Sequence, residues 1–332
     1  MRFRTFPRCD VTVSEIGFGV WTLTAGWWGT YTEAEAVTLL RQAHDQGVTF
    51  FDTGDTYGNG WGETILERAF GRMRDKIVIG SKFGYDFYNN PGLRTGQREW
   101  PQNWSAQYVR FALEQSLKRL GTDCIDVYQL HNPRIDALRQ DDLFAELEKL
   151  RQEGKIRAYA TTLGPAIAER QVEEGIVSYT GRQCHGVQII YNLLEQMIGQ
   201  GVFPTAREHG GGIMVRIPHS SGMLEGNLTA DTVFPKEDHR SHRPKEWLTE
   251  GLKKVERLRF LTEDRGMTLG QAALKFILAE PSVTSILPNI YNAEQLREFT
   301  SATEKPDLTA DDLARINDLY THNFYLEPSG VV

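Results

Sequence analysis

Short apolar runs alternate with longer amphipathic segments along almost the whole chain, and this alternation restricts the fold more than any other feature. The apolar runs lie at 16–21, 47–52, 77–82, 125–131, 156–162, 186–191, 212–217 and 283–287. Such runs are typical of buried strands, and the segments between them are typical of crossover helices. Strands joined in this way pair in parallel with right-handed connections. The chain therefore predicts an α/β fold of the (β/α)8 TIM-barrel type.

Helix and turn signals agree with this pattern. A capping box at Thr32–Glu35 predicts a helix that reaches about Gln46, where Gly47 ends it. Pro7–Asp10 lies between two short extended pieces and predicts an N-terminal β-hairpin, and extra helices include one that begins near Asn292. No linker or composition break marks a second domain, so we expect 1–332 to form a single domain. The remaining expected helices cover 61–73, 105–120, 139–153, 165–174, 202–209 and 268–279.

Composition narrows the possible partners and location. The formal net charge is −7, whereas nucleic-acid binding relies on clustered Lys and Arg, so we expect no nucleic-acid partner. The chain has no apolar run near the roughly 18 residues that span a bilayer, and its first residues lack the apolar centre of a secretory signal. The cysteines Cys9, Cys124 and Cys184 have no metal-ligand spacing and fit free thiols. We expect a cytoplasmic protein without a membrane partner or a bound metal.

Polar residues end three successive expected strands. Asp52 ends the second strand, Lys82 the third and His131 the fourth, and Tyr57 follows shortly after Asp52. Catalytic groups of parallel β/α barrels lie at the C-terminal ends of the strands. We therefore expect these four side chains to meet in one site.

The four side chains fit acid–base chemistry on a carbonyl group. A free phenol has a pKa of about 10, and a nearby ammonium lowers that pKa. Tyr57 would then be the acid, Lys82 the ammonium beside it, and Asp52 the carboxylate that keeps the amine charged. His131 can donate a hydrogen bond to the carbonyl oxygen and orient it.

The segment 51–58, with Lys82 and His131 at the next two strand ends, resembles the Asp-and-Tyr signature of the aldo-keto reductase superfamily. The resemblance extends to 287–289. It implies a barrel oxidoreductase that uses NADP(H) or NAD(H) to interconvert a small-molecule carbonyl and an alcohol, with Tyr57 as proton donor. No Gly-x-Gly-x-x-Gly motif opens a helix, so the Rossmann fingerprint is absent.

The resemblance also implies a set of cofactor contacts at the strand ends. The nicotinamide carboxamide should meet Thr162 and Gln188, and Arg216 stands where relatives carry a ring that stacks on nicotinamide. Stacking by Arg216 or contact with a phosphate or substrate carboxylate are both open. Trp21 is expected to wall the substrate pocket. The full expected set is Trp21, Asp52, Thr162, Gln188, Arg216, Pro218, Ser221, Asn289, Gln295 and Glu298.

The choice between the two cofactors depends on the segment 287–298. Arg297 is its only basic residue, and Glu294 and Glu298 lie beside it. A ribose 2′-phosphate lacks an obvious cationic partner there, whereas a free ribose hydroxyl suits the carboxylates. Family habit favours NADP(H), and this local chemistry leaves NAD(H) open.

Two connections are longer than a barrel requires. The connection 84–104 carries several aromatic residues, and 218–246 carries His219 and the basic cluster at 239–243. Both follow strand ends, so we expect substrate contacts from both, with a sugar as the first candidate. The oligomeric state is open.

Two other functions use the same residues. Lys82 could act as the nucleophile of a Schiff-base aldolase on the same barrel. A cofactor-binding regulatory subunit is a further alternative. Borohydride trapping separates the first alternative from a reductase, and measurable turnover excludes the second.

Overall fold

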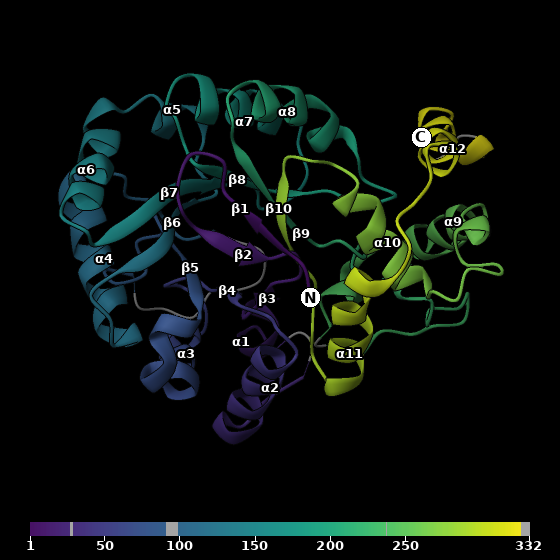
Figure 1. The fold of residues 1–332 in the computed structure, drawn as a ribbon, viewed down its shortest axis with the longest axis horizontal. Coiled ribbons are helices and arrows are strands. Elements are labelled where there is room, and N and C mark those ends of the chain that lie inside the picture. The colour runs from purple at the N-terminus through teal and green to yellow at the C-terminus, as the bar shows by residue number, and fades with distance from the viewer. Residues whose placement is uncertain (27–28, 91–98, 237, 327–332) are drawn as a thin grey trace.

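The protein is described from a computed structural model, which covers residues 1–26, 29–90, 99–236 and 238–326. Within these ranges eight parallel strands form one sheet in the order β10-β9-β8-β7-β6-β5-β4-β3 (Figure 1). A parallel bridge between Ile16 and Ile286 closes the sheet into a barrel. The predicted (β/α)8 barrel is confirmed. The strands are β3 (Phe18–Gly19), β4 (Phe50–Asp52), β5 (Val78–Phe83), β6 (Ile125–His131), β7 (Ile156–Thr162), β8 (Gly186–Ile190), β9 (Gly212–Arg216) and β10 (Val283–Leu287).

Helices surround the barrel, and further helices gather on one side of it beside α10 (Figure 1). Thr32 caps α2 in a complete capping box with Glu35, as predicted. The helices are α1 (Trp21–Thr24), α2 (Glu33–Asp45), α3 (Trp61–Phe70), α4 (Ala106–Leu120), α5 (Ile135–Leu138), α6 (Asp141–Gln152), α7 (Arg170–Thr180), α8 (Met197–Glu208), α9 (Lys245–Glu256), α10 (Leu269–Leu278), α11 (Ala293–Ser301) and α12 (Ala310–Thr321).

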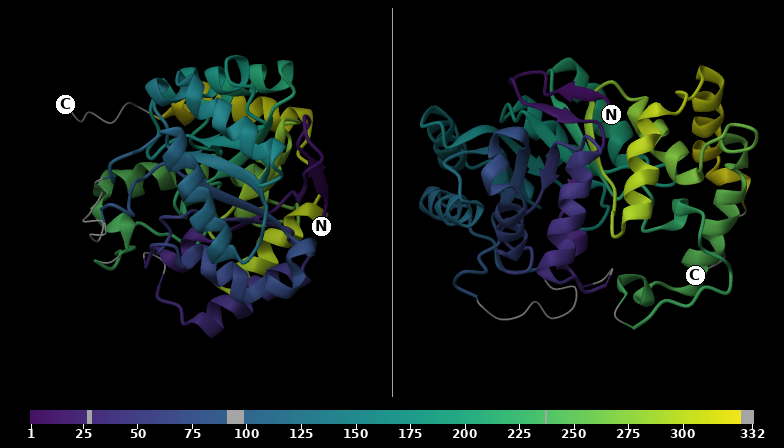
Figure 2. Two further views of the ribbon diagram at one scale, coloured as in Figure 1. Left: turned by 90° about the vertical axis from the view of Figure 1, so that its left-hand side faces the viewer. Right: turned by 60° about the horizontal axis from the view of Figure 1, so that its bottom comes forward.

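The predicted N-terminal hairpin is confirmed and plugs one end of the barrel. Strands β1 (Phe3–Thr5) and β2 (Thr12–Ser14) pair antiparallel. Phe6, which lies in the turn, is fully buried in a small cluster with residues of six barrel strands. Figure 2 shows the hairpin at one end of the barrel and the connection after β9 at the other. The C-terminal ends of the barrel strands therefore lie at the end opposite the hairpin.

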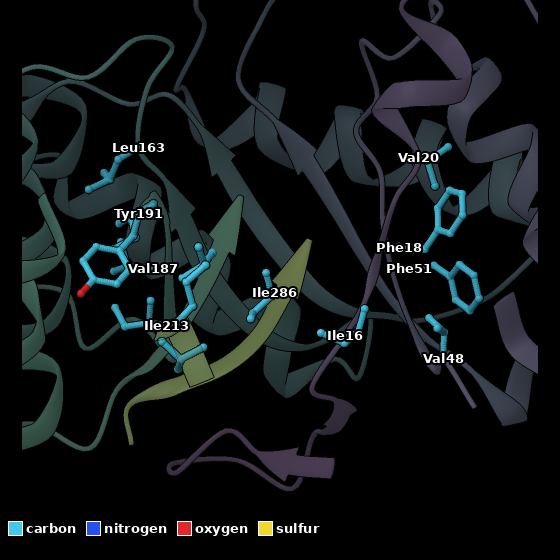
Figure 3. Packing of buried hydrophobic residues seen from close by; sticks show 14 of the residues in the cluster. Ile16, Phe18, Val20, Val48, Phe51, Leu163, Val187, Tyr191, Ile213 and Ile286 are labelled. Atoms are coloured by element: carbon cyan, nitrogen blue, oxygen red, sulfur yellow. The ribbon is translucent and has the colours of Figure 1, made fainter. Parts of the chain in front are cut away.

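The main core lies between the strands and the surrounding helices. Figure 3 shows Ile286 of β10 and Ile16 near the closing bridge, with Phe18 and Phe51 packed on neighbouring strands. The rings of Phe18 and Phe51 stack with centroids 6.2 Å apart. Apolar packing of this kind holds the strand ends in place, so the polar groups at those ends share one rigid frame.

Several boundaries differ from those expected. The first barrel strand is only Phe18–Gly19, because α1 begins at Trp21. Helix α7 begins at Arg170 rather than at 165, since Arg170 and Gln171 donate to the carbonyls of Gly164 and Ala166 and hold that segment as a loop. Helix α8 begins at Met197, before the expected 202, because its buried apolar face already includes Ile198.

Candidate active site

The four residues expected at the strand ends lie side by side. Asp52 ends β4, Lys82 is near the end of β5 and His131 ends β6, and a turn after β4 places Tyr57 over them. The Lys82 ammonium lies 4.9 Å from the centre of the Tyr57 ring. The Tyr57 and His131 rings are 5.8 Å apart, edge to face. Three strands and one turn thus bring an acid, an amine, a carboxylate and an imidazole to one point.

Lys82 is fully buried and forms an ion pair with Asp52 Oδ1. Its ammonium also donates to the Thr53 carbonyl at 2.8 Å. Burial lowers the pKa of Lys82, but the charge of Asp52 and the neighbouring Tyr57 outweigh burial and leave the pKa raised. The amine is therefore held as an ammonium.

Tyr57 differs from the expectation in one respect. The sequence suggested that the ammonium would lower the phenol pKa, whereas burial raises it and the opposing effect of Lys82 is smaller. The ammonium acts in the expected direction but is outweighed, because the loss of hydration at a buried phenol raises the pKa by more than one ammonium lowers it. Tyr57 is therefore fully protonated at neutral pH and holds a proton that it can donate.

A buried hydrogen-bond network lies beneath the four residues. Asp52 Oδ2 accepts from the amide nitrogens of Gln129 at 2.7 Å and Gln188 at 3.0 Å. Gln129 Oε1 in turn accepts from Gln188 Nε2 and from the Thr162 hydroxyl, both at 3.0 Å. Sequence reasoning missed Gln129. The available signal was its position two residues before His131, because alternate residues of a strand face the same side.

Two residues expected to contact the cofactor border the site. The Trp21 ring lies 4.8 Å from the Tyr57 ring, edge to face. Arg216 donates through Nη2 to the carbonyls of Leu163 at 2.9 Å and Pro165 at 3.2 Å. Its buried Nε has no hydrogen-bond partner in the described part of the chain. The guanidinium is therefore anchored to the loop between β7 and α7, while its Nε donor is left unpaired within the described residues.

Two of the other expected contacts, Gln295 and Glu298, already have hydrogen-bond partners in the protein. Gln295 Nε2 donates to Glu225 Oε2 at 3.0 Å, and the Tyr291 hydroxyl donates to the same oxygen at 2.8 Å. Glu298 accepts from the Thr268 hydroxyl at the start of α10. Pro218 and Ser221 are buried after β9, and Asn289 is half-buried after β10.

The connection after β5 covers His131. The Tyr85 ring lies 4.9 Å from the His131 ring, and Gln102 donates to the His131 carbonyl at 3.1 Å. Arg134 forms an ion pair with Glu99 of the same connection at 2.7 Å. Residues 91–98 of this expected substrate loop lie outside the described residues.

In the connection after β9, His219 and Arg240 were both expected to contact substrate. His219 is buried, donates to the Gly270 carbonyl at 3.1 Å and stacks on Phe299, so its expected role in holding substrate was wrong. The physical reason is that the hydrogen bond to Gly270 of α10 and the stacking on Phe299 of α11 hold the ring between these helices, away from the mouth of the barrel. In the basic cluster, Arg240 forms an ion pair with Asp238 at 2.6 Å.

The described residues contain no group of three or more His, Cys, Asp or Glu side chains arranged to hold a metal ion. None of the helices in those residues combines the length and the apolar character needed to cross a membrane.

Comparison with known proteins decides the family. The family model described as "Aldo/keto reductase family" matches residues 15–321. The chain belongs to the aldo/keto reductase family. It is 30% identical to aldo-keto reductase YhdN of Bacillus subtilis, across 99% of this chain and 96% of that one. It is 28% identical to the NADH-specific methylglyoxal reductase of Escherichia coli, across 88% and 90% of the two chains.

A solved structure shows the same relationship. The holo form of aldo-keto reductase AKR11C1 from Bacillus halodurans has a TM-score of 0.77 and 27% identity, and each chain is covered to 96%. This aldo-keto reductase is therefore an oxidoreductase that uses NADP(H) or NAD(H) to interconvert carbonyl and alcohol groups of small molecules. Nothing in the comparisons supports a Schiff-base aldolase.

Proposed function

We propose that Tyr57 is the proton donor of this reductase and that Lys82, Asp52 and His131 support it. The observation that carries the proposal is the contact between the buried Lys82 ammonium and the Tyr57 ring, with Asp52 paired to the same ammonium. A protonated Lys82 also argues against the Schiff-base alternative, which needs a neutral amine as nucleophile.

The residues divide the work as follows. Bound reduced nicotinamide supplies the hydride. The Tyr57 phenol, protonated because burial raises its pKa, transfers its proton to the carbonyl oxygen as charge develops there. Lys82 compensates the phenolate that remains, and Asp52 keeps Lys82 charged and in position. His131 donates a hydrogen bond that orients the carbonyl oxygen.

The donor and acceptor atoms at the strand ends suit a nicotinamide cofactor. In the described part of the chain no hydrogen bond reaches Gln188 Oε1, so this acceptor remains for the carboxamide N–H groups. Thr162 lies on the neighbouring strand, and Arg216 retains an unpartnered buried donor, while Trp21 walls the substrate side. We propose contacts of Pro218, Ser221, Asn289, Gln295 and Glu298 with the rest of the dinucleotide.

Several finer assignments belong to the same proposal. Gln295 and Tyr291 donate to the half-buried Glu225, and a carboxylate at this end favours a free ribose hydroxyl over a 2′-phosphate. We therefore propose that NADH is used at least as well as NADPH, as the name of the Escherichia coli relative supports. The aromatic rings around His131 suit a small carbonyl compound or a sugar. We further propose one domain over 1–332 and a cytoplasmic location, which the free thiols support.

The test is turnover of NADH and NADPH over a panel of aldehydes, ketones and sugars, with Tyr57→Phe as the blank. Tyr57→Phe should lower kcat by at least about 100-fold, because general acid catalysis contributes about 10²–10⁴-fold. Its affinity for the dinucleotide should stay within about twofold of wild type, since the hydroxyl is aimed at substrate. Retention of most of the activity by Tyr57→Phe would show that another group donates the proton.

A further inference from the structure

We propose that Gln129 is a positioning residue that turns Thr162 and Gln188 into a pair of hydrogen-bond acceptors for the cofactor carboxamide. The proposal rests on the proposed function, because it concerns the way that site holds nicotinamide. Gln129 lies on β6 and is fully buried. Its side-chain amide forms hydrogen bonds with Asp52, Gln188 and Thr162, which lie on three other strands.

The carboxylate of Asp52 sets the orientation of the whole network. An ionised carboxylate only accepts hydrogen bonds, so the amide groups of Gln129 and Gln188 must both turn their nitrogen atoms toward Oδ2. The oxygen of the Gln129 amide then points away from Asp52. The Lys82 ion pair at Oδ1 keeps Asp52 charged and so keeps this orientation.

Hydrogen bonds to the Gln129 oxygen occupy donors of Gln188 and Thr162. It accepts one N–H of Gln188 and the hydroxyl hydrogen of Thr162, each at 3.0 Å. The other N–H of Gln188 already bonds Asp52 at 3.0 Å. Gln188 can then offer a ligand only Oε1, and Thr162 can offer only the lone pairs of its hydroxyl oxygen. Both groups therefore select a ligand that donates.

Space for this network depends on Gly80 of β5. A Cβ atom at Gly80 would lie 3.1 Å from Gln129 Nε2 and 3.2 Å from Asp52 Oδ2. Such contacts are tighter than ordinary van der Waals packing, so a side chain here would press on the link between the carboxylate and the amide. The missing side chain leaves room for the two amides to approach Asp52.

The two acceptors should make the site bind a dinucleotide with a carboxamide on its pyridine ring more tightly than one with an acetyl group. A carboxamide presents two N–H donors, whereas the acetyl group of 3-acetylpyridine adenine dinucleotide presents only a carbonyl oxygen. Facing two acceptors, the acetyl group leaves them unpaired. Replacement of Gln129 by Met releases the Thr162 hydroxyl and one N–H of Gln188 as donors, and these can bind a carbonyl oxygen.

The experiment measures dissociation constants by quenching of tryptophan fluorescence, with the oxidised dinucleotide and its acetylpyridine analogue. Wild type should prefer the carboxamide by up to about tenfold, the value of one net hydrogen bond. Gln129→Met should reduce the preference to about twofold, because the two released donors remove most of that advantage. Gln196→Met is the matched control, because Gln196 is also buried and bonded through both ends of its amide outside this network. It should keep the wild-type preference.

The outcomes separate the two proposals. A Gln129→Met protein that binds with the wild-type preference would overturn the role of Gln129 and leave the proposed function intact. A wild-type protein that binds neither dinucleotide would overturn both. If Gln129→Met does not fold, Gly80→Ala replaces it and should reduce the preference in the same direction; an unchanged preference in Gly80→Ala would overturn the role.

Discussion

Removal of the Lys82 amine should destabilise the protein as well as inactivate it. The Lys82 and Asp52 side chains are 0% and 5% exposed, so Lys82→Met leaves a carboxylate buried without its counter-charge. Breaking a buried ion pair from one side costs about 3–5 kcal/mol. Asp52 keeps the hydrogen bonds from the side-chain amides of Gln129 and Gln188, which disperse part of its charge. We therefore expect the lower end, about 3 kcal/mol.

The double variant Lys82→Met/Asp52→Asn shows whether the stranded charge is the cause. The introduced asparagine is neutral and its side-chain carbonyl can still accept from the two glutamine amides, so we expect the double variant to lose only about 1 kcal/mol, one net hydrogen bond. Urea unfolding, followed by tryptophan fluorescence and circular dichroism, gives the free energies of unfolding. Both variants should lack turnover.

Two results would contradict this reasoning. One is a loss below about 1 kcal/mol in Lys82→Met, which would mean that water or protonation already relieves Asp52. The other is a double variant no more stable than the single one, since the charge of Asp52 would then not be the source of the loss.

Two further predictions concern stability alone. Burial lowers the pKa of His219 from its ordinary 6.5 to about 4. Between these two pH values the imidazole is protonated in the unfolded chain and neutral in the folded protein. The free energy of unfolding therefore falls as the pH falls through this window. Between pH 7 and pH 4 wild type should lose about 3 kcal/mol more than His219→Leu in urea unfolding; equal losses would contradict a buried neutral ring. Gly84→Ala should cost about 3 kcal/mol, because its φ is +127° and a Cβ would lie 2.2 Å from the Trp104 ring. Gly154→Ala is the control for backbone strain, because Gly154 has φ +73° and a Cβ there would have no atom within 4 Å; it should cost about 1 kcal/mol. Equal thermal or urea midpoints for Gly84→Ala and Gly154→Ala would refute the clash with Trp104.

The fold followed from local signals because each local signal was consistent with a parallel barrel. Alternation of strands and helices, the capping box at Thr32 and the glycines that follow several helices are all properties of neighbouring residues. The exact ends of the helices and strands were less predictable. The start of α7 depends on side chains of Arg170 and Gln171 that bond to a preceding loop, and the first strand is short because α1 follows it directly.

The site was partly predictable for the same reason. Asp52, Lys82 and His131 lie at or near strand ends, and the ends of parallel strands meet whatever fills the rest of the barrel. The burial of His219 was not predictable, because it depends on contacts with α10 and α11, which lie far along the chain.

The amino-acid sequence by itself determined the barrel and the four residues that meet at the C-terminal ends of its strands, since these follow from the order of strands. Only the tertiary structure decided the direction of the Tyr57 pKa, the anchoring of Arg216 and the network through Gln129. The physical reason is distance. Dehydration and hydrogen bonding act between atoms a few ångströms apart, and here those atoms belong to strands separated by many tens of residues.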